Sequence, residues 1–243
     1  MGNDVFQRHE IKFLVTQTQR RRLMNRIGGR LFPDIHGEST ICNIYYDTPD
    51  YRLIRRSLEK PSYKEKLRLR SYGPVGPQDT VFLELKKKYD GVVYKRRIEL
   101  PEAHAAAYML TPQGLPQNSQ IGREIAYCCR FYEDLQPSVY LCYDRKAFYS
   151  TDDPELRITF DQNIRFRQER MSLRERPGGR EILPPCEALM EIKTPTAMPL
   201  WLVEALSREG VRQASFSKYG QAYTMLLQEK LDESRGICHV QAV

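Results

Sequence analysis

The chain has 243 residues, of which 41% are hydrophobic and 10% aromatic, enough for one barrel-sized domain or two small ones. The formal net charge of +7 favours an anionic partner: a phosphate compound, a nucleic acid or an anionic membrane surface. No stretch is apolar enough to cross a membrane or to form an export signal, and the six cysteines include no C-x-x-C pair. We therefore expect reduced thiols, a cytoplasmic location and, because the four histidines are scattered, no zinc cluster.

Hydrophobic periodicity and turn residues predict eight strands, most of them antiparallel neighbours. In chain order, strands are expected at residues 7–15, 40–47, 64–70, 81–88, 94–100, 138–150, 155–165 and 187–194. Helices are expected at residues 16–27, 50–57, 101–110, 121–132, 199–209 and 217–231. Residues 111–118 are expected to be a linker and residues 167–185 a mobile loop. We expect residues 1–231 to form a single domain and residues 232–243 a flexible tail.

Charged and apolar residues alternate along most of these strands. In residues 64–70, for example, Lys66, Arg68 and Arg70 share one face, whereas Leu67 and Leu69 share the other. One interpretation is a half-solvated sheet with its charges in water. The other is a closed barrel with charged side chains inside and apolar side chains packed against helices. Because the pattern recurs in most strands, we favour the second: an α+β fold with an eight-stranded antiparallel β-barrel, or tunnel, flanked by helices.

Charges inside a barrel are costly unless they are paired or bind a ligand, so this lumen predicts a polyanion. The predicted lining contains Lys12, Lys66, Arg68, Arg70, Lys86, Lys88, Lys95, Arg97, Arg145, Arg157 and Lys193, with Glu10, Glu84, Glu99, Asp161 and Glu191 among them. The carboxylates could pair with the cations or hold Mg²⁺ or Mn²⁺ bridged to phosphate. Phosphoryl transfer needs positioning and charge neutralisation, so the absence of a nucleophile triad does not argue against an enzyme.

Several segments, taken in order, resemble the VTC domain, the polyphosphate polymerase branch of the triphosphate tunnel metalloenzymes, or CYTH superfamily. They are Arg8-His-Glu-Ile-Lys12, Tyr45-Tyr-Asp-Thr-Pro49, Lys66-Leu-Arg-Leu-Arg70, Phe82-Leu-Glu-Leu-Lys86, Tyr143-Asp-Arg145, Leu156-Arg-Ile-Thr-Phe-Asp161, Met190-Glu-Ile-Lys193 and Phe216-Ser-Lys-Tyr219. The resemblance implies a stand-alone, bacterial-type polymerase that transfers the γ-phosphate of ATP to a growing polyphosphate chain, with Mn²⁺ or Mg²⁺ as cofactor.

The resemblance also implies roles for individual residues. The expected catalytic residues are Arg68, Arg70, Lys86, Arg145 and Lys218. The expected phosphate-binding residues are Lys12, Lys95, Arg157 and Ser217 from the resemblance, and Lys66, Arg97 and Lys193 from their place in the predicted lining. Glu191 is the leading metal ligand both from the resemblance and from its central place on its strand, and Glu10 and Glu84 are further candidates from the predicted lining alone. Lys218 rests on the resemblance alone, because strand alternation does not locate a residue on a helix.

Two other activities remain open. A tunnel triphosphatase would hydrolyse triphosphate or a nucleotide, but its usual first strand reads Glu-x-Glu-x-Lys and here Arg8 replaces the first glutamate. A binding module would hold polyphosphate without turnover. Ser215 stands where the eukaryotic polymerases have a second lysine, which lowers the positive charge near Lys218. The central strands lack the exposed stacking aromatics of a single-strand platform, so nucleic acid is not favoured.

Overall fold

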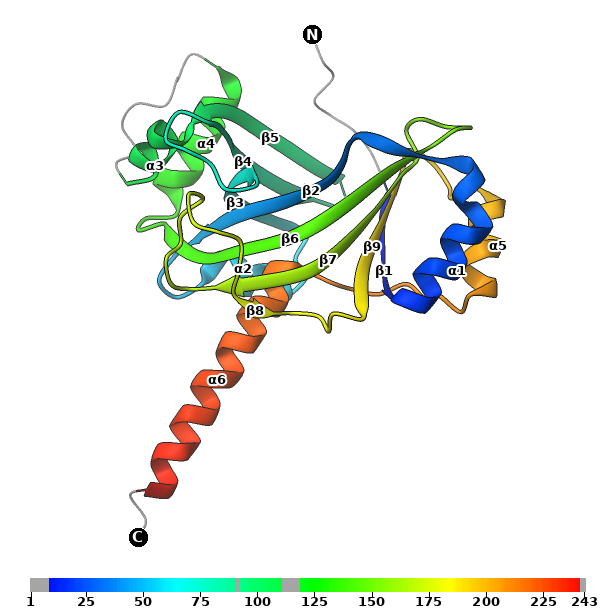
Figure 1. Cartoon of the computed structure of the whole chain (residues 1–243). Helices are drawn as coiled ribbons and strands as arrows, with labels where there is room; N and C mark the ends of the chain where they lie inside the picture. The colour runs from blue at the N-terminus through cyan, green and yellow to red at the C-terminus, as the bar shows by residue number, and fades with distance from the viewer. Residues whose placement is uncertain (1–8, 91, 111–118, 241–243) are drawn as a thin grey trace.

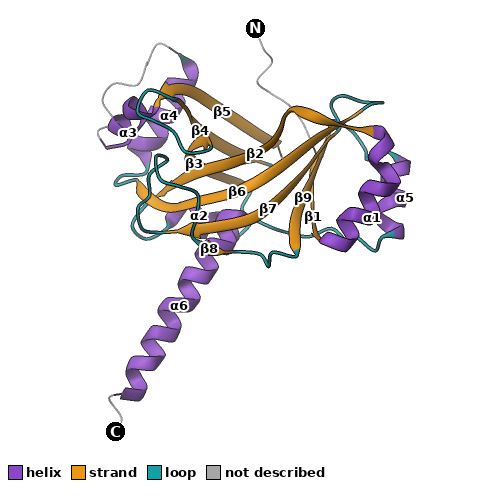
Figure 2. Cartoon of the chain, in the orientation of Figure 1, coloured by secondary structure: helices purple, strands orange, loops and turns teal. Residues whose placement is uncertain are grey.

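The computed structural model describes residues 9–90, 92–110 and 119–240, with no side-chain detail at residues 36 and 235–240. One antiparallel sheet runs through it in the order β1-β9-β7-β6-β2-β3-β4-β5, and β8 pairs with β7 (Figures 1 and 2). The strands are β1 (His9–Thr16), β2 (Leu31–Asp47), β3 (Tyr63–Tyr72), β4 (Thr80–Tyr89), β5 (Val92–Pro101), β6 (Gln136–Ser150), β7 (Arg157–Arg167), β8 (Arg180–Glu181) and β9 (Glu187–Thr194). The predicted α+β architecture with eight long antiparallel strands is confirmed.

The sheet curls but does not close. Within the described residues no backbone pairing joins β1 to β5. The free edge of β1 is instead used by the segment that precedes the last helix, because the Ala214 amide donates to the Lys12 carbonyl at 2.7 Å and Phe13 forms a bridge with Gln213. Side chains still meet across the opening, where Lys86 on β4 lies 3.5 Å from Glu10 on β1. The predicted tunnel is therefore a curled sheet with a seam.

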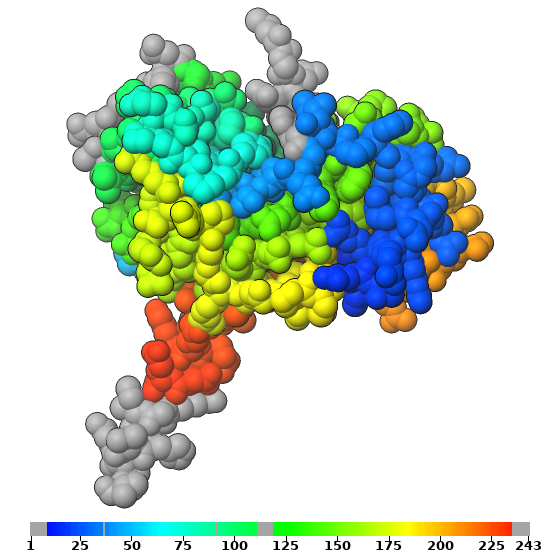
Figure 3. Space-filling model, viewed as in Figure 1, coloured from blue at the N-terminus to red at the C-terminus, as the bar shows by residue number. Residues whose placement is uncertain are grey.

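The helices cover the sheet in three groups, each with its own apolar core (Figures 1 and 2). The first group, α1 (Gln17–Ile27) and α5 (Leu200–Arg208), packs against β1, β7 and β9. The second, α3 (Glu102–Leu110) and α4 (Gln120–Phe131), packs against β2, β3 and β4. The third comprises α2 (Arg52–Leu58) and the first turns of α6 (Lys218–Val240). The later turns of α6 project from the body, and Figure 3 shows this in red for the part of the helix before residue 235.

The outward apolar face was correctly predicted. Leu67, Leu83 and Leu85 are fully buried beneath α3 and α4. Arg96, the charged exception on this face, donates from Nε to Glu124 on α4 at 3.2 Å. The apolar side of the sheet therefore carries the helices, which leaves the charged side facing inward.

Several element bounds differ from the sequence predictions. β2 begins at Leu31 and not at residue 40, because a bulge between Pro33 and Glu38 accommodates residues typical of a turn. The expected loop at residues 167–185 contains β8 and is anchored by the buried Leu173. α6 continues past residue 231 to Val240, so the flexibility of the tail stays a prediction, and the linker at residues 111–118 lies outside the described residues. Among the helices described, none has the length and apolarity to span a membrane.

Candidate functional site

The inward face of the curled sheet carries two groups of ion pairs, and each is centred on carboxylates. The Glu84 cluster consists of Glu84, Arg68, Arg70, Lys95 and Arg97, from β3, β4 and β5. The Asp161–Glu191 cluster consists of Asp161, Glu191, Arg145, Lys218 and Lys12, from β7, β9, β6, α6 and β1. Strand alternation brings all of these side chains except Lys218 to one face, as the sequence predicted.

In the Glu84 cluster one carboxylate faces four cations. Arg68 Nε and Nη2 lie 2.8 and 2.7 Å from Oε2, and Arg97 Nε and Nη2 lie 2.9 and 2.6 Å from Oε1. Lys95 Nζ is 2.7 Å from Oε1, and Arg70 Nε is 3.7 Å from Oε2. Burial opposes ionisation of Glu84, but Arg68, Arg70 and Lys95 outweigh it and hold its pKa well below the usual range. The cluster therefore keeps a surplus of positive charge.

In the Asp161–Glu191 cluster the pairing is shared between two carboxylates. Arg145 donates two hydrogen bonds to the Asp161 carboxylate, from Nε at 2.7 Å and from Nη2 at 2.8 Å. Lys218 Nζ lies 2.5 Å from Asp161 and 3.2 Å from Glu191. Lys12 and Arg145 approach Glu191 less closely, both at 3.7 Å. Although burial disfavours the charged form of Glu191, Lys218 and Lys12 hold its pKa well below the usual range.

The two residues that precede α6, together with its first turn, close one end of this face. The Lys12 ammonium donates to the Phe216 carbonyl at 2.9 Å, and Lys66 donates to the Ser217 hydroxyl at 2.9 Å. Behind them, Tyr219 is buried and stacks on Tyr45 with ring centroids 4.7 Å apart. Apolar and aromatic residues of α6 and the adjoining strands therefore fill this end, a packing that the prediction of a continuously charged lumen did not include.

Among the described residues, the Lys66 ammonium donates to the Ser217 hydroxyl and forms no ion pair with a carboxylate. Burial and the nearby charges of Lys86, Lys12 and Lys64 lower its pKa to about 7. Burial also lowers the pKa of Lys95, to about 8, although this lysine, unlike Lys66, has the nearby carboxylate of Glu84, which opposes the shift. Both side chains would gain a favourable partner if a phosphate group bound beside them.

The remaining predicted residues lie towards the seam and the periphery. Glu10 pairs with Lys12 at 3.4 Å and with Lys86 at 3.5 Å, and its pKa falls to about 2 because Lys86 and other cations outweigh burial. Lys193 lies directly opposite Glu10 in the β1–β9 register. Arg157 is 54% exposed and its described ion pair is with Asp34 at 3.7 Å, so the structure does not bring it into either cluster.

Sequence reasoning missed uncharged groups that position the arginines. Arg70 Nε donates to the Asn43 amide oxygen at 3.0 Å, and Arg68 Nη1 donates to the Tyr45 hydroxyl at 3.1 Å. Tyr143 accepts from Arg70 Nη2 at 3.4 Å, and its ring lies 4.6 Å from the Lys218 ammonium. Because Tyr143 is two residues before Arg145, strand alternation could have placed it in the site.

The carboxylate oxygens of Glu191 and Glu10 suit a hard divalent cation that is also bound by phosphate oxygens. No three His, Cys, Asp or Glu side chains form a metal site in the part of the chain that the structure describes. Mg²⁺ is commonly held by one or two carboxylates together with substrate phosphates and water. Glu191 and Glu10, whose charges influence each other, provide such oxygens. These residues therefore fit a metal that enters with its phosphate ligand.

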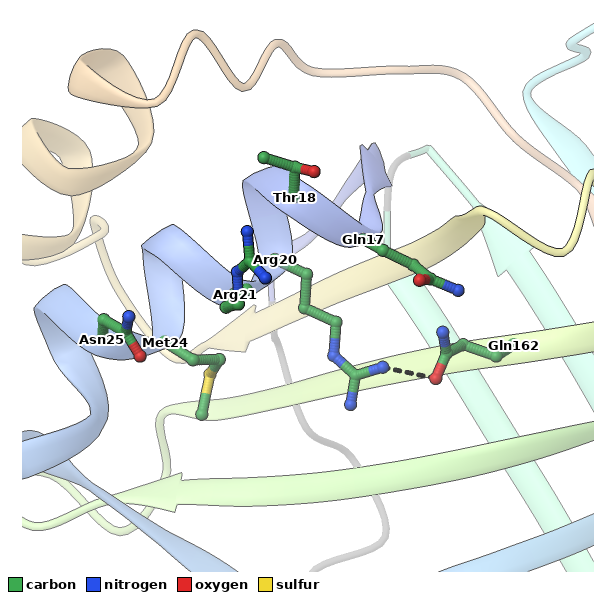
Figure 4. A pocket seen from close by; sticks show the side chains of 7 residues that line it. All are labelled: Gln17, Thr18, Arg20, Arg21, Met24, Asn25 and Gln162. Atoms are coloured by element: carbon green, nitrogen blue, oxygen red, sulfur yellow. Dashed lines mark hydrogen bonds between the residues drawn. The ribbon is translucent and has the colours of Figure 1, made fainter.

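An open pocket of about 480 Å³ lies elsewhere, on the outer side of the sheet between α1 and β7 (Figure 4). Its lining includes Gln17, Arg21 and Met24, and the Arg20 guanidinium donates to the Gln162 side chain. The Arg20 guanidinium also lies 4.8 Å from the Phe160 ring. None of the predicted site residues lines this pocket, and the chemistry of the clusters belongs to the other face of β7.

Comparison with known proteins places this geometry in context. The VTC domain matches residues 7–227. The chain is 25% identical over 226 residues to vacuolar transporter chaperone complex subunit 4 of Trypanosoma cruzi (strain CL Brener), a match that covers 77% of this chain but only 28% of that protein.

Solved structures share the fold at low sequence identity. A candidate adenylate cyclase from Bacillus halodurans superimposes with a TM-score of 0.55 and 15% identity, covering 89% of this chain and 96% of that one. A candidate adenylyl cyclase from Hippeastrum, described as having a dominant triphosphatase activity, superimposes with a TM-score of 0.52 and 16% identity, covering 86% and 92%. At these identities the likeness establishes the tunnel fold alone.

Proposed function

Because the chain belongs to the VTC domain family, we propose that it is a metal-dependent polyphosphate polymerase, which transfers the γ-phosphate of ATP to a growing polyphosphate chain inside the basic tunnel. The observation that carries this proposal is the convergence of cations from β1, β3, β4, β5, β6, β9 and α6 on one inward face, where they outnumber the carboxylates. A long polyanion would be neutralised along such a face from several sides.

The proposed chemistry needs positioned charge and no protein nucleophile. Arginines and Lys218 would hold the phosphates in line and stabilise the charge that develops in the transition state. Glu191, with Glu10 nearby, would hold Mn²⁺ or Mg²⁺, and that ion would neutralise phosphate oxygens. We also propose a cytoplasmic location, which is supported by free thiols at the described cysteines Cys42, Cys128, Cys129, Cys142 and Cys186.

The decisive experiment separates synthesis from hydrolysis. Purified protein is incubated with ATP and Mn²⁺, and polyphosphate and free phosphate are measured separately. We expect polyphosphate from the wild type, and a fall of about 100-fold or more in Arg68→Ala, because that side chain contacts Glu84 and the Tyr45 hydroxyl in the tunnel. Free phosphate without polyphosphate would instead identify a triphosphatase. Polyphosphate binding without either product would identify a binding module.

The lowered pKa of Lys66 predicts how polyanion binding depends on pH. A lysine with a pKa of about 7 is charged below that pH and increasingly neutral above it. Since phosphate favours the charged form, the affinity for tripolyphosphate should fall between about pH 6 and about pH 9, by roughly threefold to tenfold from this group. Isothermal titration calorimetry across this range would measure the fall.

Lys66→Arg provides the control for this prediction. Arginine keeps its charge throughout the range, so the contribution of Lys66 should disappear. Tripolyphosphate itself gains negative charge as pH rises, but it does so equally for both proteins, and the difference between them isolates Lys66. Parallel pH profiles for the wild type and Lys66→Arg would show that Lys66 does not change its protonation state on binding.

A further inference from the structure

Glu84 occupies the centre of a ladder of cations. In the backbone register it stands directly opposite Arg68 on β3 and directly opposite Arg97 on β5. Its side chain is 1% exposed. Arg70 and Lys95 are diagonal neighbours from the same two strands, so the sheet itself aims every cation of the Glu84 cluster at one carboxylate.

The carboxylate oxygens of Glu84 are already saturated. Five nitrogen–oxygen distances, from Arg68 Nε and Nη2, Arg97 Nε and Nη2, and Lys95 Nζ, are 2.9 Å or less. A carboxylate offers about four lone-pair sites, so a metal ion would have to displace one of these cations. Glu191 differs, because the cations nearest to it lie at 3.2 to 3.7 Å. The two glutamates therefore have different capacities for metal.

We propose that Glu84 is a positioning residue: its carboxylate is a fixed internal counterion that holds the cations of the Glu84 cluster in place for phosphate, and it is not a metal ligand. This inference rests on the proposed function in so far as phosphate is the ligand of the tunnel. Four cations aimed at one point repel one another, and a single buried carboxylate reduces this repulsion while leaving positive charge for the ligand. The arginines can then meet phosphate without rearranging.

The test compares Glu84→Gln with a matched control on the opposite face of the same strands. Glu124 pairs with Lys87 on β4 and Arg96 on β5, outside the tunnel. Glu124→Gln therefore makes the same change in net charge without altering the lumen. Tripolyphosphate binding is measured calorimetrically in metal-free buffer with EDTA, and ATP turnover is measured as Mn²⁺ is varied.

If Glu84 is a counterion, Glu84→Gln removes an anion that competes with phosphate, so metal-free tripolyphosphate should bind roughly threefold or more tightly. The kcat should fall about tenfold or more because the cations lose their fixed positions, while the Mn²⁺ concentration for half-maximal activity stays unchanged. Glu84→Asp keeps the charge and should retain wild-type metal-free affinity. Unchanged or weaker binding by Glu84→Gln, or a raised Mn²⁺ requirement, would overturn the proposal.

A second variant covers the case in which Glu84→Gln does not fold. Glu84→Gln combined with Lys95→Ala removes one charge of each sign, so it should fold and melt at a higher temperature than the single variant. A double variant no more stable than Glu84→Gln would contradict the counterion role. A wild-type protein that makes no polyphosphate would defeat the proposed polymerase, yet metal-free binding and melting would still decide the role of Glu84.

Discussion

Replacement of Lys218 by methionine is expected to reduce polyphosphate synthesis by about 100-fold or more, the range seen when a preorganised charge is removed from a transition state. The Lys218 side chain is 10% exposed, and its ammonium lies 2.5 Å from Asp161 and 3.2 Å from Glu191. The two carboxylates raise its pKa above the usual value despite burial, so it is a permanent cation at the end of the tunnel.

The fold should survive this substitution. Arg145 still pairs with Asp161 through two hydrogen bonds, so the expected cost in the free energy of unfolding is about 1–3 kcal/mol. Urea denaturation measures that cost, and kcat is measured with ATP and Mn²⁺. Lys230→Met is the matched control, because it removes the same charge from an exposed position of the same helix. Equal activities of Lys218→Met and Lys230→Met would show that Lys218 does not take part in the proposed catalysis.

The inward residues of the strands could be predicted because a strand alternates its side chains with a period of two. Lys12, Arg68, Arg145 and Glu191 therefore fall on the same face whatever the exact strand ends are. Strand alternation does not reach Lys218, because it is the first residue of α6 and only the docking of that helix brings it to Glu191. The resemblance to a family supplied what the periodicity could not.

Which cation meets which carboxylate depends on register, and register is a tertiary property. The sequence shows Lys66 and Arg68 as equivalent neighbours on one face. In the structure, β3 places Arg68 opposite Glu84 but places Lys66 opposite Lys86. One is consequently a tightly paired arginine, and the other is a lysine whose pKa falls to about 7. This difference could not be seen in either residue or in its immediate neighbours.

The apolar end of the lumen has the same origin. Leu189 shares a strand face with Glu191, and Leu141 shares one with Arg145, so alternation alone would expose both to the ligand. The first turns of α6 cover them, and Tyr219 and Ala222 complete a buried core there. The predicted lumen was therefore too long, because the sequence of a helix does not reveal which surface its apolar face packs against, and Arg157 at its periphery lies outside both clusters.

Arg145 contacts Asp161 through two hydrogen bonds, so we expect its role to depend on the planar geometry of the guanidinium as well as on its charge. Arg145→Lys keeps the positive charge but replaces a planar fork with a single ammonium, which cannot make both hydrogen bonds to Asp161. We expect kcat to fall by roughly tenfold to 100-fold, and by more in Arg145→Ala, which leaves Asp161 buried with Lys218 as its remaining close cation.

Lys146→Ala is the control, because it removes a cation from the next residue of β6, on the outer face, where the side chain pairs with Glu38. Its activity should match the wild type. If Arg145→Lys were as active as the wild type, the tunnel would need a positive charge at this position but not a bidentate guanidinium. Loss of activity in Lys146→Ala as well would indicate that β6 had been disturbed, and circular dichroism of both variants would separate that effect from chemistry. The order expected here, wild type and Lys146→Ala above Arg145→Lys above Arg145→Ala, follows from the two hydrogen bonds that position the guanidinium.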